Sequence, residues 1–474
     1  FNTTGDKVAV GLSTVDGRVP VDGALSRHLT ETIGDETNAY EYELNSEKFS
    51  LADFRENSEN NVDLFSKAQK YGVFFRDWEK SDRYGNNNVR LASMGPRVNL
   101  KRKRKNGRND YLIMGSNDYL GFSSHPEVLK AAKDAIDKYG FGSTGSPLTT
   151  GISDIHEQLS ALLAQMFHKE KVILFNSGYA ANLGTIAGLI QAQDLVVSDM
   201  IAHASIQDGM KMAQGASRFF KHNNVQHLDG LLEEHRKDYA GSLVVTEGVF
   251  SMDGDVAPLD EIVKVARKHK SRIMVDEAHS FGVIGATGLG GCEKYDVLDQ
   301  VDIVMGTFSK ISGSIGGFIA TSNDVADWLY WLARSHMFSV SIPPSTAAAT
   351  LKSLEIFNRD KSILQSLQAN IKHFSNGLRS LGFDISQNHE SAVLPAVIGD
   401  QEKLGIMNKH LMDAGVFVVP VPYPAVSRTK IRFRFTVIAS HTTSDLDYAL
   451  NVLESAMEKA DFRPQKQGDK PKAA

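Results

Sequence analysis

Lys310 lies in a segment whose composition suits chemistry on a bound ligand. It follows the largely apolar residues 301–305 and precedes the glycine-rich residues 312–317. Small residues let a planar ligand approach the backbone, and the hydroxyls of Thr307 and Ser309 can bind an anion. An amine that burial or nearby positive charge deprives of its proton is a nucleophile that forms imines with carbonyl compounds. We therefore predict a Schiff-base role for Lys310, against the commoner case of a solvated surface lysine.

A carboxylate and an imidazole, Asp276 and His279, follow an apolar run at residues 272–275. A buried carboxylate needs a positive partner, and the protonated nitrogen of a pyridine ring is one candidate. The letters Asp-Glu-Ala-His also end a strand in helicase-type ATPases. That alternative requires an upstream phosphate-binding loop of the pattern Gly-x-x-x-x-Gly-Lys-Ser/Thr, and the sequence contains none.

Two further segments suit a phosphate group and a flat ring. Residues 172–175 predict a buried strand, and Ser177, Gly178 and Tyr179 follow it at the start of a predicted helix. Backbone N–H groups at such a place bind phosphate readily. The ring of His203 could stack on an aromatic cofactor, although a lone histidine is more often structural.

Polar residues after two later strands complete the set. Glu247 and Ser251 follow a strand that is predicted to end at residue 246. Arg432 and Arg434 alternate with phenylalanines on one predicted strand, so both face the same side and form a fork that suits a substrate carboxylate. The default alternative for these arginines is a surface ion pair. Because ligands of open parallel sheets bind at the carboxyl ends of strands, we expect these groups to meet there.

Together these residues match the needs of one cofactor, pyridoxal 5'-phosphate. It requires a lysine for the imine, an acid for the pyridine nitrogen, a phosphate cradle, a ring to stack against and an arginine for an amino-acid carboxylate.

Alternating apolar runs and amphipathic patterns from residue 111 onward predict the elements that position these groups. They indicate an α/β fold with a mostly parallel central sheet flanked by helices. The predicted strands of this sheet are residues 172–175, 194–197, 217–220, 242–246, 272–275, 302–305 and 317–320. The predicted helices include residues 65–71, ended by Gly72, and residues 124–139, 153–167 and 328–338, with a long helix from about residue 345. Strands near residues 392–398, 416–419 and 430–435 predict a smaller C-terminal α+β domain.

These patterns divide the 474-residue chain into five segments. We expect residues 1–60 to form an acidic, partly ordered extension and residues 461–474 a disordered tail. Between them we predict an N-terminal arm at 61–110, a large cofactor-binding domain at 111–345 and the C-terminal domain at 346–460. The basic run at residues 101–105 invites a nucleic-acid hypothesis, but the following Asn106-Gly107 favours an exposed hairpin or loop.

The composition indicates a cytoplasmic protein without a nucleic-acid partner or a membrane span. A net charge of -5 and a pI near 6.3 do not favour a polyanion partner. The sequence shows no apolar run long enough to cross a bilayer and no signal segment. Cys292 is the single cysteine, so neither an intrachain disulfide nor a cysteine metal cluster is expected, and we predict no metal site. The chain begins with Phe1 rather than Met, which suggests trimming upstream.

From about residue 65 to about residue 460, the sequence resembles the α-oxoamine synthases, which are fold-type I pyridoxal-phosphate enzymes. The matching blocks are residues 116–121, 178–182, 203–205, 246–254, 276–279 and 307–310, followed by Arg434. In the sequence of most of these blocks, the chain is most similar to serine palmitoyltransferase. Residues 246–255 are more similar to 8-amino-7-oxononanoate synthase.

The resemblance implies a decarboxylative Claisen condensation, in which a small amino acid (serine, glycine or alanine) and an acyl thioester give an α-amino ketone, CO2 and free thiol. It implies that Lys310 forms the imine with the cofactor and later moves the α-proton. Asp276 would pair with the pyridine nitrogen and His279 with the ring hydroxyl, and His203 would stack on the ring. The other residues that we assign by resemblance are Ser177, Gly178, Tyr179, Thr307 and Ser309 around the phosphate, Glu247 and Ser251 on the cofactor, and Asn117, Tyr119 and Arg434 on the substrate.

The resemblance also implies a homodimer with interface active sites, to which residues 339–344 contribute. One departure concerns the acyl donor, because the family's Gly-Ser-Arg loop reads Gly145-Ser146-Pro147 here and proline supplies no charge. The donor is therefore open between acyl-CoA and an acyl carrier protein. The alternative functions are a fold-type I transaminase or amino-acid lyase, which would not share all the blocks, and a non-catalytic scaffold, against which the intact Lys310, Asp276 and His203 argue.

Overall fold

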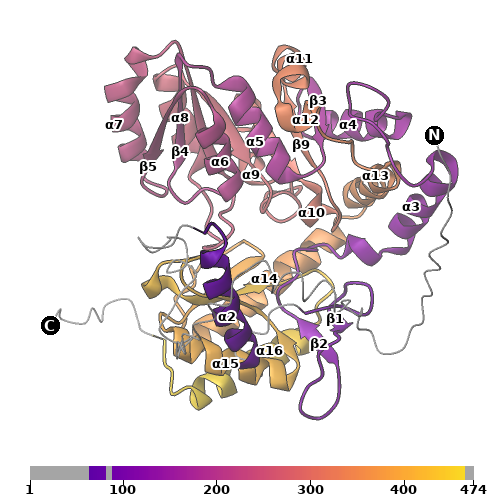
Figure 1. Ribbon diagram of the computed structural model, residues 1–474, viewed down its shortest axis with the longest axis vertical. Coiled ribbons are helices and arrows are strands. Elements are labelled where there is room, and N and C mark those ends of the chain that lie inside the picture. The colour runs from indigo at the N-terminus through magenta and orange to yellow at the C-terminus, as the bar shows by residue number, and fades with distance from the viewer. Residues whose placement is uncertain (1–62, 82–87, 465–474) are drawn as a thin grey trace, which may run out of the picture. The chain divides into compact units, whose positions relative to one another are not determined.

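A seven-stranded sheet lies at the centre of the computed structural model, which describes residues 63–81 and 88–464 (Figure 1). Its strand order is β3-β9-β8-β7-β6-β4-β5, and β9 alone in this sheet runs antiparallel to its neighbours. The strands are β3 (Lys171–Phe175), β4 (Asp194–Asp199), β5 (Ala216–Phe220), β6 (Gly241–Glu247), β7 (Arg272–Asp276), β8 (Ile303–Thr307) and β9 (Gly317–Thr321). The mostly parallel sheet is thus confirmed, and each strand agrees with its prediction within two residues at each end.

Helices cover both faces of this sheet because its strands are apolar on both sides. Along β4, for example, Val196 belongs to one hydrophobic cluster and Val197 to the other. The helices of one face are α5 (Gly178–Leu189), α6 (Ala204–Met212) and α11 (Asn323–Leu332). Those of the other face include α4 (Asp154–Met166), α7 (Val225–His235) and α8 (Leu259–Lys268). Burial on both faces is typical of parallel strands.

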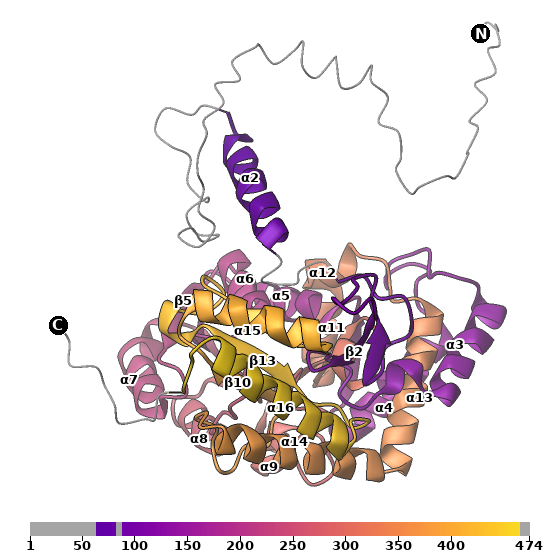
Figure 2. The same ribbon diagram turned by 90° about the horizontal axis from the view of Figure 1, so that it is seen from below.

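Two three-stranded sheets accompany the central one. The first is antiparallel, in the order β10-β13-β12, and consists of β10 (Val393–Val397), β12 (Val419–Val421) and β13 (Arg432–Thr436). It lies beside α14 (Ser362–Ser380), α15 (Gln401–Ala414) and α16 (Thr443–Lys459), as Figure 2 shows. These elements confirm a smaller C-terminal α+β part.

The second small sheet joins distant parts of the chain. It consists of β1 (Arg97–Asn99), β2 (Asp110–Ile113) and β11 (Val416–Phe417), and β2 runs parallel to β11. β2 lies at the boundary predicted between the arm and the large domain, yet its partner comes from the C-terminal segment. The exact domain boundaries stay a prediction.

The connection between β1 and β2 carries the basic run and is a hairpin loop, as predicted. The Gly107 N–H donates to the Arg104 carbonyl at 2.9 Å within this loop. Arg104 departs from the expected exposure, because its guanidinium forms an ion pair with Asp110 and donates to the Ala414 carbonyl at 3.1 Å.

The remaining helices of the described chain are α2 (Ser66–Ser81), α3 (Pro126–Tyr139), α9 (Gly291–Lys294), α10 (Phe308–Ile311), α12 (Arg334–Met337) and α13 (Pro344–Arg359). None of the helices in the described ranges is long and apolar enough to cross a membrane. Residues 1–60 and most of the predicted tail lie outside the described residues.

Three predicted elements differ from the structure. The helix that was expected to end at Gly72 continues as α2, because one glycine inside a helix costs only about 1 kcal/mol. The helix predicted over residues 328–338 is two helices, since Ala333 adopts an extended ψ of 96°. The strand predicted over residues 416–419 is divided between β11 and β12, which belong to different sheets.

Candidate active site

Most of the predicted site residues line one cavity of about 290 Å³, at the carboxyl ends of β6, β7 and β8. These strands end at Glu247, Asp276 and Thr307. Larger cavities, such as one of about 730 Å³ beside α14, contain none of the predicted residues. The position matches the rule that ligands bind where parallel strands end.

Lys310 lies on the short helix α10, directly after β8, and lines this cavity. Enclosure by protein atoms lowers the pKa of Lys310 to about 8, although the carboxylates of Asp276 and Glu247 act in the opposite direction. About a tenth to a fifth of the amine is therefore neutral between about pH 7 and about pH 7.4, far more than for an ordinary lysine, and the neutral form is the one that attacks a carbonyl group.

Asp276 is held in place by two hydrogen bonds. Its Oδ1 accepts from the Ala278 N–H at 2.8 Å, and its Oδ2 accepts from Asn182 Nδ2 at 2.7 Å. Asn182 Nδ2 also donates to Ser205 Oγ at 2.9 Å. Asn182 and Ser205 line the cavity, but sequence reasoning gave them no role. The available signal was the spacing of Asn182 from Gly178, four residues apart and so on one face of α5.

His279 is buried and hydrogen-bonded to Tyr119, whose hydroxyl oxygen lies 2.6 Å from His279 Nδ1. Burial, and then the positive charges of Lys310 and Arg434, lower the pKa of His279 well below its usual value. Burial raises the pKa of Tyr119 to about 12, so the phenol keeps its proton and can donate it to Nδ1. In that arrangement the neutral imidazole carries its own proton on Nε2. Tyr119, predicted at the substrate, lies against His279 and does not line the cavity.

His203 is the N-cap residue of α6, and its side chain lines the cavity. Its Nδ1 lies 2.7 Å from Ser205 Oγ, and its backbone N–H donates to Glu247 Oε1 at 2.6 Å. Although the side chain is partly exposed, desolvation by the surrounding protein lowers its pKa. Burial and the charge of Asp276 raise the pKa of Glu247 well above its usual value, which favours a protonated carboxyl beside Asp276.

The start of α5 is the place where the sequence predicts a phosphate cradle. Ser177 is its N-cap residue and accepts from the Ala180 N–H at 3.0 Å. A Cβ on Gly178 would lie 2.9 Å from both Cβ and Oγ1 of Thr307, so only glycine fits. The Thr307 and Ser309 hydroxyls lie 2.9 Å apart at the same place. Helix N–H groups and hydroxyls therefore converge, together with Tyr179, on one end of the cavity.

Neither arginine of the predicted fork lines the cavity, but Arg434 lies next to Asn117, which does. Arg432 donates to Asp253 Oδ1 at 2.7 Å and to the Met252 carbonyl at 3.0 Å, which makes it a buried ion pair. Arg434 donates through Nε to the Ser251 carbonyl at 2.7 Å, and Nη2 lies 3.4 Å from Asn117 Oδ1. Both arginines share a face, as predicted, but Asp253 neutralises one of them.

Known proteins are similar to this chain in sequence and in structure. Residues 109–453 match the family described as aminotransferase class I and II. An 8-amino-7-oxononanoate synthase from Thermoanaerobacter pseudethanolicus is 37% identical over 345 residues, which are 73% of this chain and 87% of the relative. A longer relative, the 4-hydroxy-2,2'-bipyrrole-5-methanol synthase PigH of a Serratia strain, is 36% identical over 397 residues, which are 84% of this chain and 60% of PigH. The solved structure of a serine palmitoyltransferase variant from S. paucimobilis with bound PLP–myriocin matches with a TM-score of 0.79 at 30% identity, over 84% of this chain and 99% of that one.

Proposed function

We propose that the residues of one cavity carry out the reaction of the α-oxoamine synthases. This chain belongs to that group, within the aminotransferase class I and II family. The reaction is a pyridoxal phosphate-dependent, decarboxylative condensation of a small amino acid (serine, glycine or alanine) with an acyl thioester. The products are an α-amino ketone, CO2 and a free thiol. The observation that carries the assignment is the enclosed amine of Lys310 in one cavity with the carboxylate of Asp276.

The residues of the cavity fit pyridoxal phosphate. The start of α5, where a side chain on Gly178 would collide with Thr307, suits the phosphate, and Asp276 suits the protonated ring nitrogen. When bound, the cofactor withdraws electrons from the α-carbon of the amino acid and so stabilises a carbanion there.

Lys310 serves twice in this proposal. Its neutral amine would hold the cofactor, and the same nitrogen would move the α-proton of the amino acid. A pKa of about 8 allows both, because the amine can accept and release a proton near neutral pH.

The two histidines orient the cofactor. His203 would stack on its ring, and the Glu247 carboxyl holds the His203 backbone. His279 would donate from Nε2 to the ring hydroxyl, because the Tyr119 hydroxyl occupies Nδ1. Ser251 remains a predicted ring contact, for which its place next to Arg434 is the support.

Arg434 and Asn117 bind the carboxylate of the amino acid. Arg434 is a buried cation without a carboxylate partner among the described residues, whereas Arg432 has Asp253. A buried cation of this kind suits an anionic substrate group.

In this proposal the acyl donor meets the loop that contains Pro147, and proline offers no cation. The Pro147 carbonyl accepts a hydrogen bond from the Tyr330 hydroxyl at 2.7 Å. This arrangement gives no contact for a CoA phosphate at that position, and so favours a carrier-bound acyl chain over acyl-CoA. We further propose a homodimer with interface active sites and a cytoplasmic location, for which the single, buried Cys292 is a supporting observation.

The direct test is thioester-dependent release of CO2, with mass analysis of the product. Serine, glycine and alanine are each paired with acyl-CoA and with an acyl carrier protein. The proposal expects CO2 and an α-amino ketone for at least one pair. Transfer of the amino group to a keto acid without CO2 would identify a transaminase instead.

An absorbance scan tests the role of Lys310 separately. Protein with added pyridoxal phosphate should show a violet-region band from the imine, and Lys310→Ala should abolish it. Lys211→Ala is the matched control, because Lys211 is an exposed lysine on α6. A band that survives in Lys310→Ala would contradict the assignment.

A further inference from the structure

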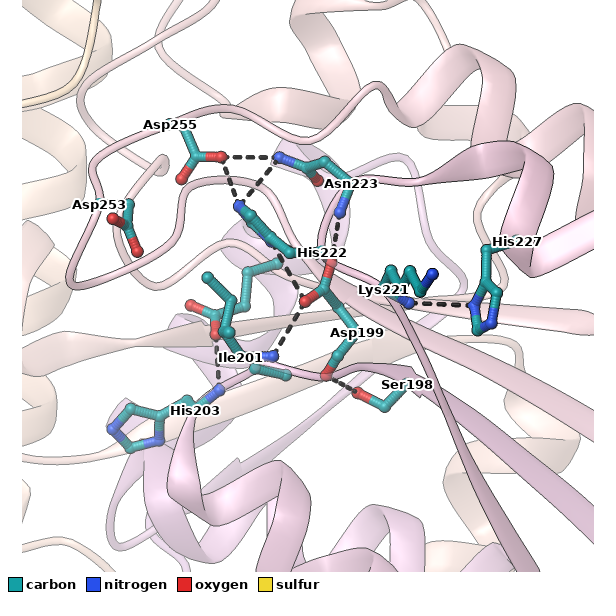
Figure 3. A network of polar contacts seen from close by, with 12 residues as sticks. Ser198, Asp199, Ile201, His203, Lys221, His222, Asn223, His227, Asp253 and Asp255 are labelled. Atoms are coloured by element: carbon teal, nitrogen blue, oxygen red, sulfur yellow. Dashed lines mark hydrogen bonds and ion pairs between the residues drawn. The ribbon is translucent and has the colours of Figure 1, made fainter. Parts of the chain in front are cut away.

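His222 lies outside the cavity, between two carboxylates. Its Nδ1 is 3.1 Å from Asp199 Oδ2, and its Nε2 is 2.7 Å from Asp255 Oδ2 (Figure 3). A neutral imidazole has a single N–H, so hydrogen bonds to both carboxylates require the imidazolium. Burial alone would lower the pKa of His222, but its bonds to Asp199 and Asp255 raise the pKa to about 9. His222 is therefore a cation at neutral pH.

Asp199 is the fixed end of this arrangement. It is the last residue of β4, and its side chain is completely buried. Its oxygens also accept from the Ile201 N–H at 3.0 Å and from the Asn223 N–H at 2.8 Å. Such a carboxylate is anchored to the central sheet and cannot easily follow a moving loop.

Asp255 is the other end, and it lies on the loop between β6 and α8. Its Oδ2 accepts a second hydrogen bond, from Asn223 Nδ2 at 2.7 Å. On the same loop, the ring of Phe250 meets the His222 ring edge-on, with the ring centroids 4.5 Å apart. His222 and Asn223, in the segment after β5, thus hold this loop against the sheet.

The same loop carries the acceptor of the proposed substrate arginine. Ser251 offers its carbonyl to Arg434 Nε at 2.7 Å, and Asp253 pairs with Arg432. With Nε engaged, the guanidinium directs Nη2 toward Asn117. A shift of the loop would remove that acceptor and let the guanidinium turn.

We propose that His222 is a positioning residue for substrate carboxylate binding, which ties Asp255 and the loop of residues 248–256 to Asp199 and thereby orients Arg434. The inference rests on the proposed function, because it takes Arg434 as the carboxylate ligand. His222 contacts neither cofactor nor substrate in this role.

The test compares two affinities of the same protein. In His222→Gln, the dissociation constants of L-serine, glycine and L-alanine are measured from the absorbance of the bound cofactor, and that of pyridoxal phosphate by titration. We expect the dissociation constant of the amino acid that binds to rise about tenfold, as for the loss of one charge-assisted contact. The dissociation constant of pyridoxal phosphate should change by less than about twofold. Asp255→Ala removes the carboxylate through which the loop is held to His222. This variant should give the same selective effect if His222→Gln does not fold.

The matched control is His227→Gln. His227 lies five positions further along and accepts from the Lys221 N–H at 3.1 Å, and in the described structure it is hydrogen-bonded to neither Asp199 nor Asp255 (Figure 3). This variant should leave both affinities unchanged. Equal losses of amino-acid and pyridoxal phosphate affinity in His222→Gln would indicate general damage to the fold and overturn the proposal.

A double-mutant cycle separates this inference from the proposed function. Arg434→Gln should weaken amino-acid binding, and adding His222→Gln to it should cause little further loss, because His222 acts through Arg434. Additive losses would overturn the inference and leave the role of Arg434 intact. An unchanged amino-acid affinity in Arg434→Gln would overturn both.

Discussion

At the residue scale, the reactivity of Lys310 comes from its surroundings more than from its type. Enclosure lowers its pKa, while Asp276 and Glu247 limit the effect. The raised pKa of Glu247 reduces the negative charge next to Asp276, because two ionised carboxylates side by side would repel each other. This arrangement favours one ionised carboxylate, which we propose for the pyridine nitrogen, and an amine that loses its proton near pH 8.

We expect attachment of pyridoxal phosphate to depend on pH with a midpoint near 8. The lowered pKa of Lys310 means that the reactive, neutral amine gains population as the pH rises through about 8. The rate constant should therefore increase about tenfold between about pH 7 and about pH 9 and then level off. Stopped-flow absorbance of the protein freed of cofactor measures it. N-acetyl-lysine methylamide is the control, and a protein rate that keeps rising with that of the free amine would contradict the expectation.

At the element scale, the start of α5 depends on close contact between two strand ends and a helix. A Cβ on Gly317 would lie 2.7 Å from the backbone N and Cα of Gly178, and Gly178 in turn lies against Thr307. This contact brings the first N–H groups of α5 next to the Thr307 hydroxyl. The proposed phosphate cradle therefore depends on the packing of the helix against the strands and not on the loop alone.

We expect Gly178→Ala to weaken pyridoxal phosphate binding by at least about tenfold. The new methyl group would lie 2.9 Å from Thr307, so the helix start must move away from the cradle. Equilibrium titration of the cofactor measures the loss, and thermal unfolding reports any cost to the fold. Gly230→Ala on α7 is the control, because a Cβ there meets no atom within 4 Å. Unchanged affinity in Gly178→Ala would remove the helix start from the phosphate site.

At the scale of the whole molecule, large apolar side chains are exposed on and after α11. Trp331 is 61% exposed and Phe338 is 68% exposed, and Trp328 and Val340 are also exposed. Ile315, which lines the cavity, is exposed as well. Apolar groups of this size gathered along one segment indicate a surface that a partner covers, which supports the proposed homodimer.

We expect the double variant Trp331→Glu/Phe338→Glu to change the particle from two chains to one. Each glutamate would place a charge in an apolar interface, where it is costly to desolvate. Sedimentation velocity at micromolar concentration measures the mass. Val397→Glu, on the edge strand β10, is a matched control with an exposed apolar side chain elsewhere. A single-chain particle for the unaltered protein would contradict the dimer.

The sequence by itself determined the fold class, the seven central strands and the residue types of the site. These follow from local patterns, because strand periodicity, glycine-rich turns and helix starts are encoded over a few neighbouring residues. The blocks around Lys310, Asp276 and His203 were enough to predict the cofactor and the family, which the comparisons confirm.

Only the tertiary structure decided which side chain meets which. Arg434 approaches Asn117 across 317 residues of sequence, and Tyr119 meets His279 across 160. Arg432 and Arg434 look equivalent in the sequence, yet packing gives Arg432 a carboxylate partner, whereas Arg434 has none among the described residues. The position of His222 between two carboxylates has no signature in the local sequence. His222, Asp199 and Asp255 lie on separate segments, which only the folded sheet brings together.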